Sequence, residues 1–133
     1  MRILRAHGMA TSAIHVIFNA VVVAKLTYAA SSWWGFTTAE DRQRLEAVIR
    51  RGIRSGLCAP EHMFLEHLVT DTDDKRFNLI LHARDHVLHS ILSSRSDFNY
   101  NLRPRRHNIV LTAKNLSITD RDFITRMIYK DIY

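Results

Sequence analysis

The chain has 133 residues with a hydrophobic share of 47%, 4 glycines and 2 prolines, which is a globular composition and excludes a disordered or low-complexity protein. It carries 19 Lys and Arg against 13 Asp and Glu, and the formal net charge of +6 favours polyanionic partners such as nucleic acid. The single cysteine, Cys58, excludes an intrachain disulfide and a zinc knuckle, and it is typical of an intracellular protein of the nucleus or cytoplasm. Basic residues are in excess in residues 1–56 and 93–133, and acidic residues in 57–92.

The first long apolar run predicts a helix over Ala13–Ser31, capped by Thr11 or Ser12 and free of Gly and Pro. At about 100° per residue one face collects the apolar side chains Ile14, Ile17, Phe18, Val21 and Tyr28, and further apolar residues surround the rest. We therefore expect a core helix enclosed by protein. The two tryptophans that follow it, Trp33 and Trp34, are interpreted as closing the core.

Two other interpretations of this run are less favourable. Ala13–Trp34 is long enough to cross a bilayer, but a lysine at its centre, Lys25, costs about 2.5–3.5 kcal/mol there. The basic start Met1–Arg5 resembles that of a signal peptide, yet no convincing cleavage site follows. A membrane span is the third choice, and we expect no membrane partner.

The clearest amphipathic helix begins near Ala39. Thr38 and Asp41 have the spacing of a capping box, and Gly56 is placed to take a left-handed conformation after the helix end. Leu45, Val48, Ile49, Gly52 and Ile53 form the expected buried side, and Gln43, Arg50, Arg51 and Arg54 the expected solvent side.

Residues beyond Gly56 predict shorter elements. The acidic middle indicates helices over Pro60–Val69, Asp73–Leu81 and Asp85–Leu92. An extended basic arm over 93–108, a short strand at Ile109–Leu111 and a last helix over Arg121–Asp131, capped within Thr119–Asp122, are expected after it. The predicted fold is mainly α, a small bundle of about five to six helices with an extended basic arm near the C-terminus. We divide it into a helical domain, 1–92, and the arm plus C-terminal helix, 93–133.

No catalytic residue, metal site or cofactor is predicted. The trios His82, His86, His89 and Cys58, His62, His67 have metal-like spacings, but neither an HExxH motif nor a CxxC pair accompanies them, so we interpret them as structural. Asp71, Asp73 and Asp74 are interpreted as a helix N-cap in preference to a Mg²⁺ site. A glycine-rich phosphate loop and a GxSxG motif are absent from the sequence.

Two basic features favour nucleic acid. In the arm, Arg103, Arg105 and Arg106 combine phosphate-binding charge with the ring of Tyr100, which could stack on a base. A solvated arm that packs onto the core through Tyr100 is an equally good interpretation. The second feature is the set of helical arginines Arg50, Arg51 and Arg54. By itself this set would be interpreted as an ordinary solvent-exposed helix face. Together with the arm it predicts nucleic-acid binding.

Several segments resemble the region downstream of the polymerase core in reverse transcriptases of non-long-terminal-repeat retrotransposons, especially jockey-like elements. The similar segments are Val21–Trp34, Asp41–Arg51, Asp74–Phe77, His86–His89, Tyr100–Asn108 and Asp122–Tyr133, and the string Tyr-Asn-Leu-Arg-x-Arg-x-His at Tyr100–His107 is the most specific. The family's catalytic Tyr/Phe-x-Asp-Asp turn does not occur in this sequence. The resemblance therefore implies a non-catalytic thumb and C-terminal fragment of a mobile element's RNA-directed DNA polymerase, with 1–92 thumb-like and no polymerase activity alone.

The resemblance also implies partners. Arg50, Arg51 and Arg54 would face the template-primer duplex, so the expected partners are RNA or an RNA/DNA hybrid and the rest of a reverse transcriptase polyprotein. The alternative is a structural or protein-interaction remnant of a degenerate element, in which the apolar helix of residues 13–34 has lost the domain it packed on and drives self-association.

Overall fold

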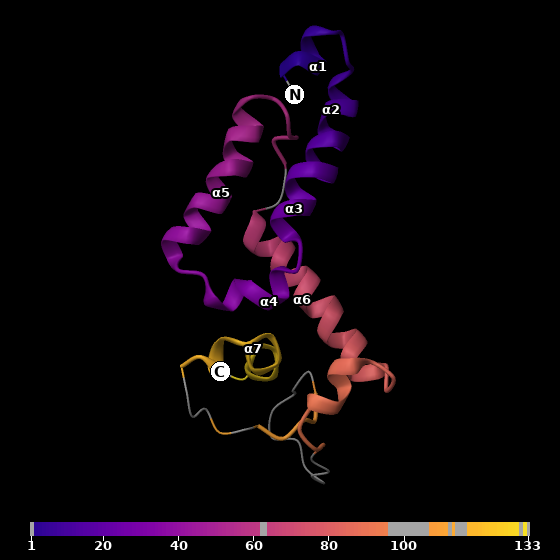
Figure 1. The fold of residues 1–133 in the computed structure, drawn as a ribbon, viewed down its shortest axis with the longest axis vertical. Helices are drawn as coiled ribbons and strands as arrows, with labels where there is room; N and C mark the ends of the chain where they lie inside the picture. Colours follow the sequence, from indigo (N-terminus) through magenta and orange to yellow (C-terminus); the bar gives the residue numbers. More distant parts are fainter. Residues whose placement is uncertain are drawn as a thin grey trace. The chain divides into compact units, whose positions relative to one another are not determined.

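The computed structural model describes residues 2–61, 64–95, 107–111, 113, 117–130 and 132 and is mainly helical, which confirms the predicted fold class (Figure 1). Its elements are α1 Arg2–Ala6, α2 Thr11–Phe18, the π-helix η1 Asn19–Val23, α3 Ala24–Thr27, α4 Ala30–Trp33, the 3₁₀ helix η2 Trp34–Phe36, α5 Ala39–Arg54, α6 Leu65–His82, the 3₁₀ helices η3 Val87–Ile91 and η4 Thr119–Arg121, and α7 Phe123–Tyr129. In place of the strand predicted at Ile109–Leu111, one antiparallel bridge joins Arg95 and Ile109.

The chain divides into two compact units. Unit 1 comprises Met1–Ala30 and Thr37–Asp71, and unit 2 comprises Ser31–Phe36 and Thr72–Tyr133. The division by contacts falls within α6, at a different place from the predicted domain boundary after residue 92, which stays a prediction.

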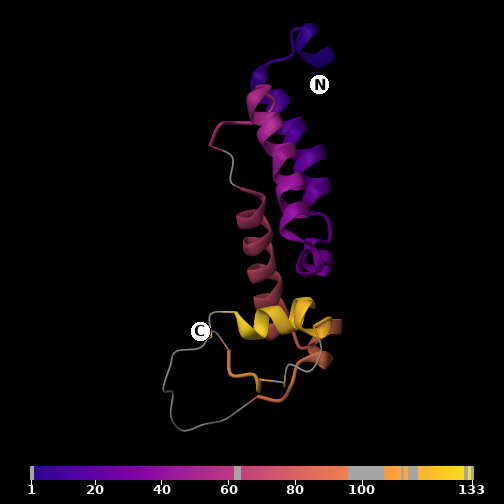
Figure 2. The same ribbon diagram turned by 90° about the vertical axis from the view of Figure 1, so that its left-hand side faces the viewer.

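Unit 1 is built on the packing of α5 against the rod formed by α2, η1 and α3, which run side by side in both ribbon views (Figures 1 and 2). Its core joins the buried side chains of Phe18, Val23, Ile49 and Cys58. Partly buried Val22, Leu26, Ile53, Leu57 and Leu68 pack around this core. The predicted buried side of α5 is thus present at Ile49 and Gly52 and in part at Leu45 and Ile53, whereas the prediction for Val48 is wrong, since it is 37% exposed.

A π-helical turn changes which residues of the first rod face the core. The N–H of Ala24 bonds to the carbonyl of Asn19, five residues back, so one extra residue enters the turn. Buried Ile14, Phe18 and Val23 consequently follow one another at spacings of four and then five residues. The predicted face ran on to Val21 and Tyr28, which is wrong because the extra residue moves Val21 outward.

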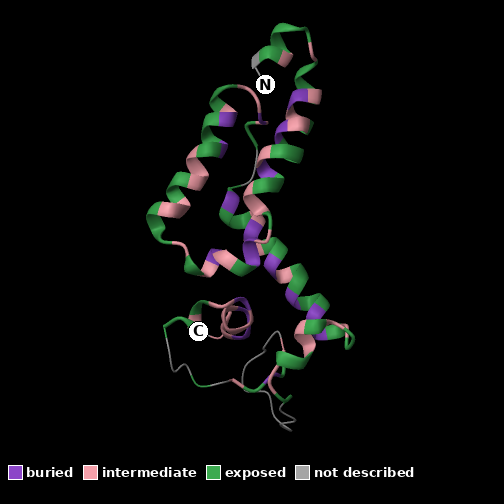
Figure 3. Ribbon diagram, viewed as in Figure 1, coloured by how far each residue is buried: buried purple, intermediate pink, exposed green. Residues whose placement is uncertain are grey.

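Only Ile14, Phe18 and Val23 of this rod are buried, which contradicts the prediction of a helix enclosed by protein (Figure 3). Val16, Val21 and Tyr28 are 66%, 57% and 78% exposed. The helical stretch also ends earlier than predicted, because Tyr28 leaves the helical region and Ala29 takes a φ of +49°. By length and composition Thr11–Phe36 could cross a membrane, and 17% of its most apolar window is buried.

The acidic middle forms one helix where two were predicted. α6 runs without interruption from Leu65 to His82, and the carboxylate of Glu46 accepts a hydrogen bond from the N–H of Leu65 at 2.9 Å. Its buried residues Leu65, Val69, Asp73, Phe77, Ile80 and Leu81 make one stripe at spacings of mostly four residues. The predicted third helix of this region is the shorter 3₁₀ helix η3.

Unit 2 has its own core, where α7 lies across the C-terminal half of α6 (Figure 2). The buried side chains are Phe77, Ile80, Leu81, Ile109, Phe123, Met127 and Ile128. Asp122, the last residue of the predicted capping segment Thr119–Asp122, caps α7, since its carboxylate accepts a hydrogen bond from the N–H of Thr125 at 2.9 Å. This core buries the apolar side chains Phe77, Ile80 and Leu81 of the second half of α6.

Candidate nucleic-acid interface

The predicted capping box fixes the start of α5. The hydroxyl of Thr38 accepts a hydrogen bond from the N–H of Asp41 at 3.1 Å, and the Asp41 carboxylate accepts one from the N–H of Thr38 at 3.0 Å. The Thr38 hydroxyl also donates to this carboxylate at 2.7 Å. Hydrogen bonds from the side chain and then the backbone of Thr38 lower the pKa of Asp41, because they stabilise its charged form.

Close packing at Gly52 fixes which side of α5 turns inward. A Cβ atom at this position would lie 2.3 Å from Cζ and 2.7 Å from Cε2 of Phe18. The absence of a side chain therefore lets the buried Phe18 ring rest directly on the helix backbone. With Ile49 and Gly52 buried, the opposite side of α5 faces solvent.

Arg5 of α1 holds the C-terminal end of α5. The guanidinium of Arg5 donates hydrogen bonds to the carbonyls of Ser55 at 3.0 Å and Gly56 at 2.5 Å. Gly56 has a φ of +62°, as predicted for the residue that follows the helix. A positive charge at this end complements the partial negative charge of the helix C-terminus.

The three predicted arginines of α5 lie on its solvent side. Arg50, Arg51 and Arg54 are all exposed, and at 100° per residue they fall within an arc of about 100°. Arg50 and Arg54 are one turn, about 6 Å, apart along the axis. Among the residues that the structure describes, the three side chains make no hydrogen bond or ion pair.

The arginines nearer the start of the same helix are engaged. Arg44 pairs with Glu40 at 2.5 Å, and Arg42 donates to the hydroxyl of Thr37 at 3.0 Å and lies 3.9 Å from a carboxylate oxygen of Glu66. All three acidic residues of α5 lie in its first half, so the positive charge of the second half is not compensated within the helix. Arginines near a helix C-terminus also stabilise the helix by about 0.3–1 kcal/mol each, so this placement has a structural benefit as well.

The arm residues of the predicted interface, Tyr100, Arg103, Arg105 and Arg106, lie outside the described residues. Their role in binding nucleic acid stays a prediction. The described part of the candidate interface is therefore the solvent side of α5 near its C-terminus, which can contact phosphates irrespective of base sequence.

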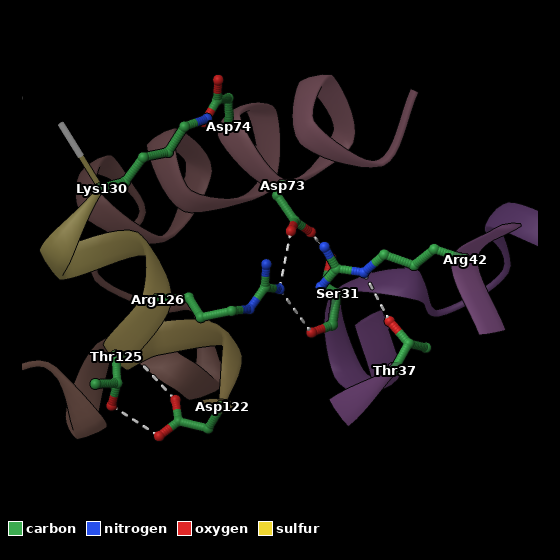
Figure 4. A network of polar contacts seen from close by, with 9 residues as sticks. All are labelled: Ser31, Thr37, Arg42, Asp73, Asp74, Asp122, Thr125, Arg126 and Lys130. Atoms are coloured by element: carbon green, nitrogen blue, oxygen red, sulfur yellow. Dashed lines mark hydrogen bonds and ion pairs between the residues drawn. The ribbon is translucent and has the colours of Figure 1, made fainter. Parts of the chain in front are cut away.

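Sequence reasoning missed a polar cluster in unit 2 (Figure 4). Asp73, interpreted as part of a helix N-cap, lies in the middle of α6 and is 2% exposed, so that interpretation is wrong. Its carboxylate accepts hydrogen bonds from the hydroxyl of Ser31 at 2.5 Å and from the guanidinium of Arg126 at 3.0 Å. The neighbouring Asp74 pairs with Lys130 at 2.6 Å. These contacts hold α7 on α6, and we assign them a structural role.

The structure describes all three members of one histidine trio, His82, His86 and His89, and two members of the other, Cys58 and His67. His82 ends α6 and His86 precedes η3, so His82, His86 and His89 do not lie on one helix. The described residues contain no group of three or more His, Cys, Asp or Glu side chains that could hold a metal ion. His62 lies outside them, and burial raises the pKa of the Cys58 thiol, which disfavours the thiolate that metals bind.

No protein-family model, no curated protein and no solved structure matches this chain. The geometry of the residues themselves is thus the basis for a functional proposal.

Proposed function

We propose that the chain is a non-catalytic nucleic-acid-binding module whose primary contact is the exposed arginine side of α5. The observation that carries the proposal is that Arg50, Arg51 and Arg54 share one exposed side and make no side-chain pairing among the described residues. Unpaired guanidinium groups lose no intramolecular partner when they bind phosphate, and they present several donors to its oxygens.

The rigidity of the helix also supports this role. α5 is capped at both ends and packed against Phe18, so its arginines project from a fixed frame. Contacts from a fixed frame to a regular backbone lose less conformational freedom on binding than contacts from a flexible segment.

The resemblance to the thumb region of retrotransposon reverse transcriptases suggests the class of partner. On that basis we propose an intracellular role in which α5 lies against the backbone of a template-primer duplex, RNA or an RNA/DNA hybrid, beside the rest of a polymerase chain. The arm arginines Arg103, Arg105 and Arg106 and the ring of Tyr100 would extend the contact along the strand.

The experiment measures the affinity for an RNA/DNA hybrid as a function of salt, for the wild-type chain and for Arg50→Ala/Arg51→Ala/Arg54→Ala. Three lost phosphate contacts should make the log-log salt slope shallower by about two to three. A matched control, Lys25→Ala/Arg84→Ala/Arg121→Ala, removes the same net charge from exposed positions outside α5. If both triple variants lose affinity equally, the binding is non-specific attraction to net charge and the assignment to α5 is wrong.

A second candidate function, a protein-interaction remnant, is favoured by the exposed apolar side chains of the first rod. Val16 and Val21 are more than half exposed although valine is ordinarily a core residue. On this reading the purified chain self-associates through that rod, and Val16→Lys/Val21→Lys restores a monomer. A monomeric mass by light scattering at all accessible concentrations would contradict this candidate.

A further inference from the structure

The first helix, α1, brings a further arginine to the C-terminal end of α5 within unit 1 (Figures 1 and 2). The guanidinium of Arg5 lies 3.0 Å from the carbonyl oxygen of Ser55 and 2.5 Å from that of Gly56. Because Ser55 directly follows Arg54, the bond lengths place Nη1 of Arg5 within about 10 Å of the Cα atom of Arg54. Arg5 is therefore a spatial neighbour of the α5 arginines although it is distant from them in the sequence.

The two segments that meet at this point carry no acidic side chain. Residues 1–39 contain no Asp or Glu, and neither do residues 47–60. Among the described residues Arg5 hydrogen-bonds to the two backbone carbonyls and forms no ion pair. The partial charge of the helix C-terminus, about −0.5, offsets only part of its positive charge. The remainder adds to the charge of the α5 arginines, and a patch of one sign attracts anions.

Arg5 also keeps hydrogen-bond donors for a ligand. A guanidinium has five N–H donors, and the two carbonyls occupy one on each Nη atom. The other three belong to an exposed side chain. Since the carbonyls already hold the guanidinium in place, it loses less conformational freedom when a ligand binds than a mobile side chain does. Arg5 is thus anchored to the end of α5 and able to donate to a phosphate in the same conformation.

We propose that Arg5 is a fourth phosphate-binding residue of the α5 interface, so that α1 and the C-terminal half of α5 bind nucleic acid together. The inference rests on the proposed function of α5 and adds a contact from a second element to it. A duplex rises about 3.4 Å per nucleotide of each strand, so groups about 10 Å apart can contact phosphates about three nucleotides apart on one strand. The ligand that fits this spacing is a continuous phosphodiester backbone.

The test compares Arg5→Gln with Lys25→Gln in the salt dependence of binding to an RNA/DNA hybrid. Both variants remove one positive charge from an exposed position of unit 1. Lys25 follows buried Val23 by two residues, which places it about 200° around the rod from the packed side. Loss of one phosphate contact should make the log-log slope of Arg5→Gln shallower by about 0.7–0.9, and Lys25→Gln should keep the wild-type slope.

The slope also separates phosphate binding from a purely structural role of Arg5. If Arg5 only closes the end of α5, its loss lowers the folded fraction without changing the number of phosphate contacts, and Arg5→Gln keeps the wild-type slope. Urea unfolding of each variant gives that folded fraction independently.

A second measurement uses the wild-type chain and does not depend on the folding of a variant. As the hybrid is added to ¹⁵N-labelled protein, the Nε–H signal of Arg5 should shift saturably together with that of Arg54. The signal of Arg84, an exposed arginine of unit 2, should not shift. Equal shifts of Arg5 and Arg84 would show general attraction of arginines to the hybrid and would contradict a defined role for Arg5.

Equal slopes for Arg5→Gln and Lys25→Gln, or an Arg5 signal that stays unchanged at saturation, would overturn this inference. The proposed function fails by a different result, namely the same slope for Arg50→Ala/Arg51→Ala/Arg54→Ala and its charge-matched control. A shallower slope in that triple variant with no change in Arg5→Gln contradicts the role of Arg5 and leaves the α5 interface in place.

Discussion

The packing of Phe18 on the backbone of α5 predicts that Gly52→Ala destabilises the protein, although alanine is the better helix former. The added Cβ would lie 2.3 Å from Cζ of Phe18, whereas carbon atoms in contact are about 3.5–4.0 Å apart, so the ring must move by more than 1 Å. Phe18 is 3% exposed and surrounded by Val23, Ile49 and Cys58, which leaves it little room. Overpacking of this kind costs about 1–3 kcal/mol and the gain in helix propensity is about 0.8–1.0 kcal/mol, so we expect a net loss of up to about 2 kcal/mol.

The assay is urea unfolding followed by far-ultraviolet circular dichroism. Gln43→Gly and Gln43→Ala form the matched control, because Gln43 is an exposed position of the same helix where only propensity acts and alanine should be more stable by about 0.8–1.0 kcal/mol. In the double variant Gly52→Ala/Phe18→Leu the shorter side chain should relieve part of the clash, giving a favourable coupling between the two changes. If Gly52→Ala instead stabilises the chain by as much as Gln43→Ala is more stable than Gln43→Gly, Phe18 does not pack on this helix as described.

Three further predictions concern other parts of the chain. Asp73→Ala should lower the free energy of unfolding by about 2–4 kcal/mol in the same assay, because it leaves Arg126 without its buried partner. Asp74→Ala should lower it by about 1 kcal/mol or less. Similar losses in the two variants would contradict the structural role of Asp73. The pKa of Asp41 is lowered in the folded state, so the contribution of its carboxylate to stability is complete above the ordinary value of 3.8 and is lost as the pH falls below that value. The difference in unfolding free energy between wild type and Asp41→Asn should therefore shrink with acidification. A difference that is independent of pH would refute this. Burial raises the pKa of the Cys58 thiol, so a thiol reagent should modify the native chain much more slowly than the urea-unfolded chain, and equal rates would place Cys58 at the surface.

The parts of the fold that local chemistry specifies were predictable. The capping box at Thr38, the apolar spacing through Ile49 and the glycine at position 56 together defined α5 with its arginines facing solvent, and the structure agrees except at Val48, which is exposed. Each of these signals acts within a few residues along the chain. The direction of Arg50, Arg51 and Arg54 therefore followed from the sequence, while their binding role stays a proposal.

The first rod was predicted less well, because a π-helical turn has no clear sequence signal. Its extra residue replaces Val21 by Val22 and Val23 on the packed side, and a regular 3.6-residue period cannot represent that shift. The high apolar content of the run also suggested burial on all sides. Composition alone does not say whether enough neighbouring chain exists to cover such a helix, and here Val16 remains mostly exposed.

The continuity of α6 and the position of Asp73 carried signals that were overlooked. No glycine or proline interrupts residues 61–95, so there was no reason in the sequence to end a helix at Val69. Asp73 also lies four residues after Val69 and four before Phe77, on the buried stripe, and a carboxylate at such a position indicates a buried partner. The identity of that partner was not predictable, because Ser31 and Arg126 are 42 and 53 residues away in the chain.

The most direct test of the central claim is the salt dependence of binding to an RNA/DNA hybrid by the wild-type chain, the α5 triple variant and the charge-matched triple variant. The account predicts a steep dependence for the wild type and the control, and a slope shallower by about two to three for Arg50→Ala/Arg51→Ala/Arg54→Ala. Identical slopes for all three proteins, or a wild-type affinity that does not respond to salt, would contradict it.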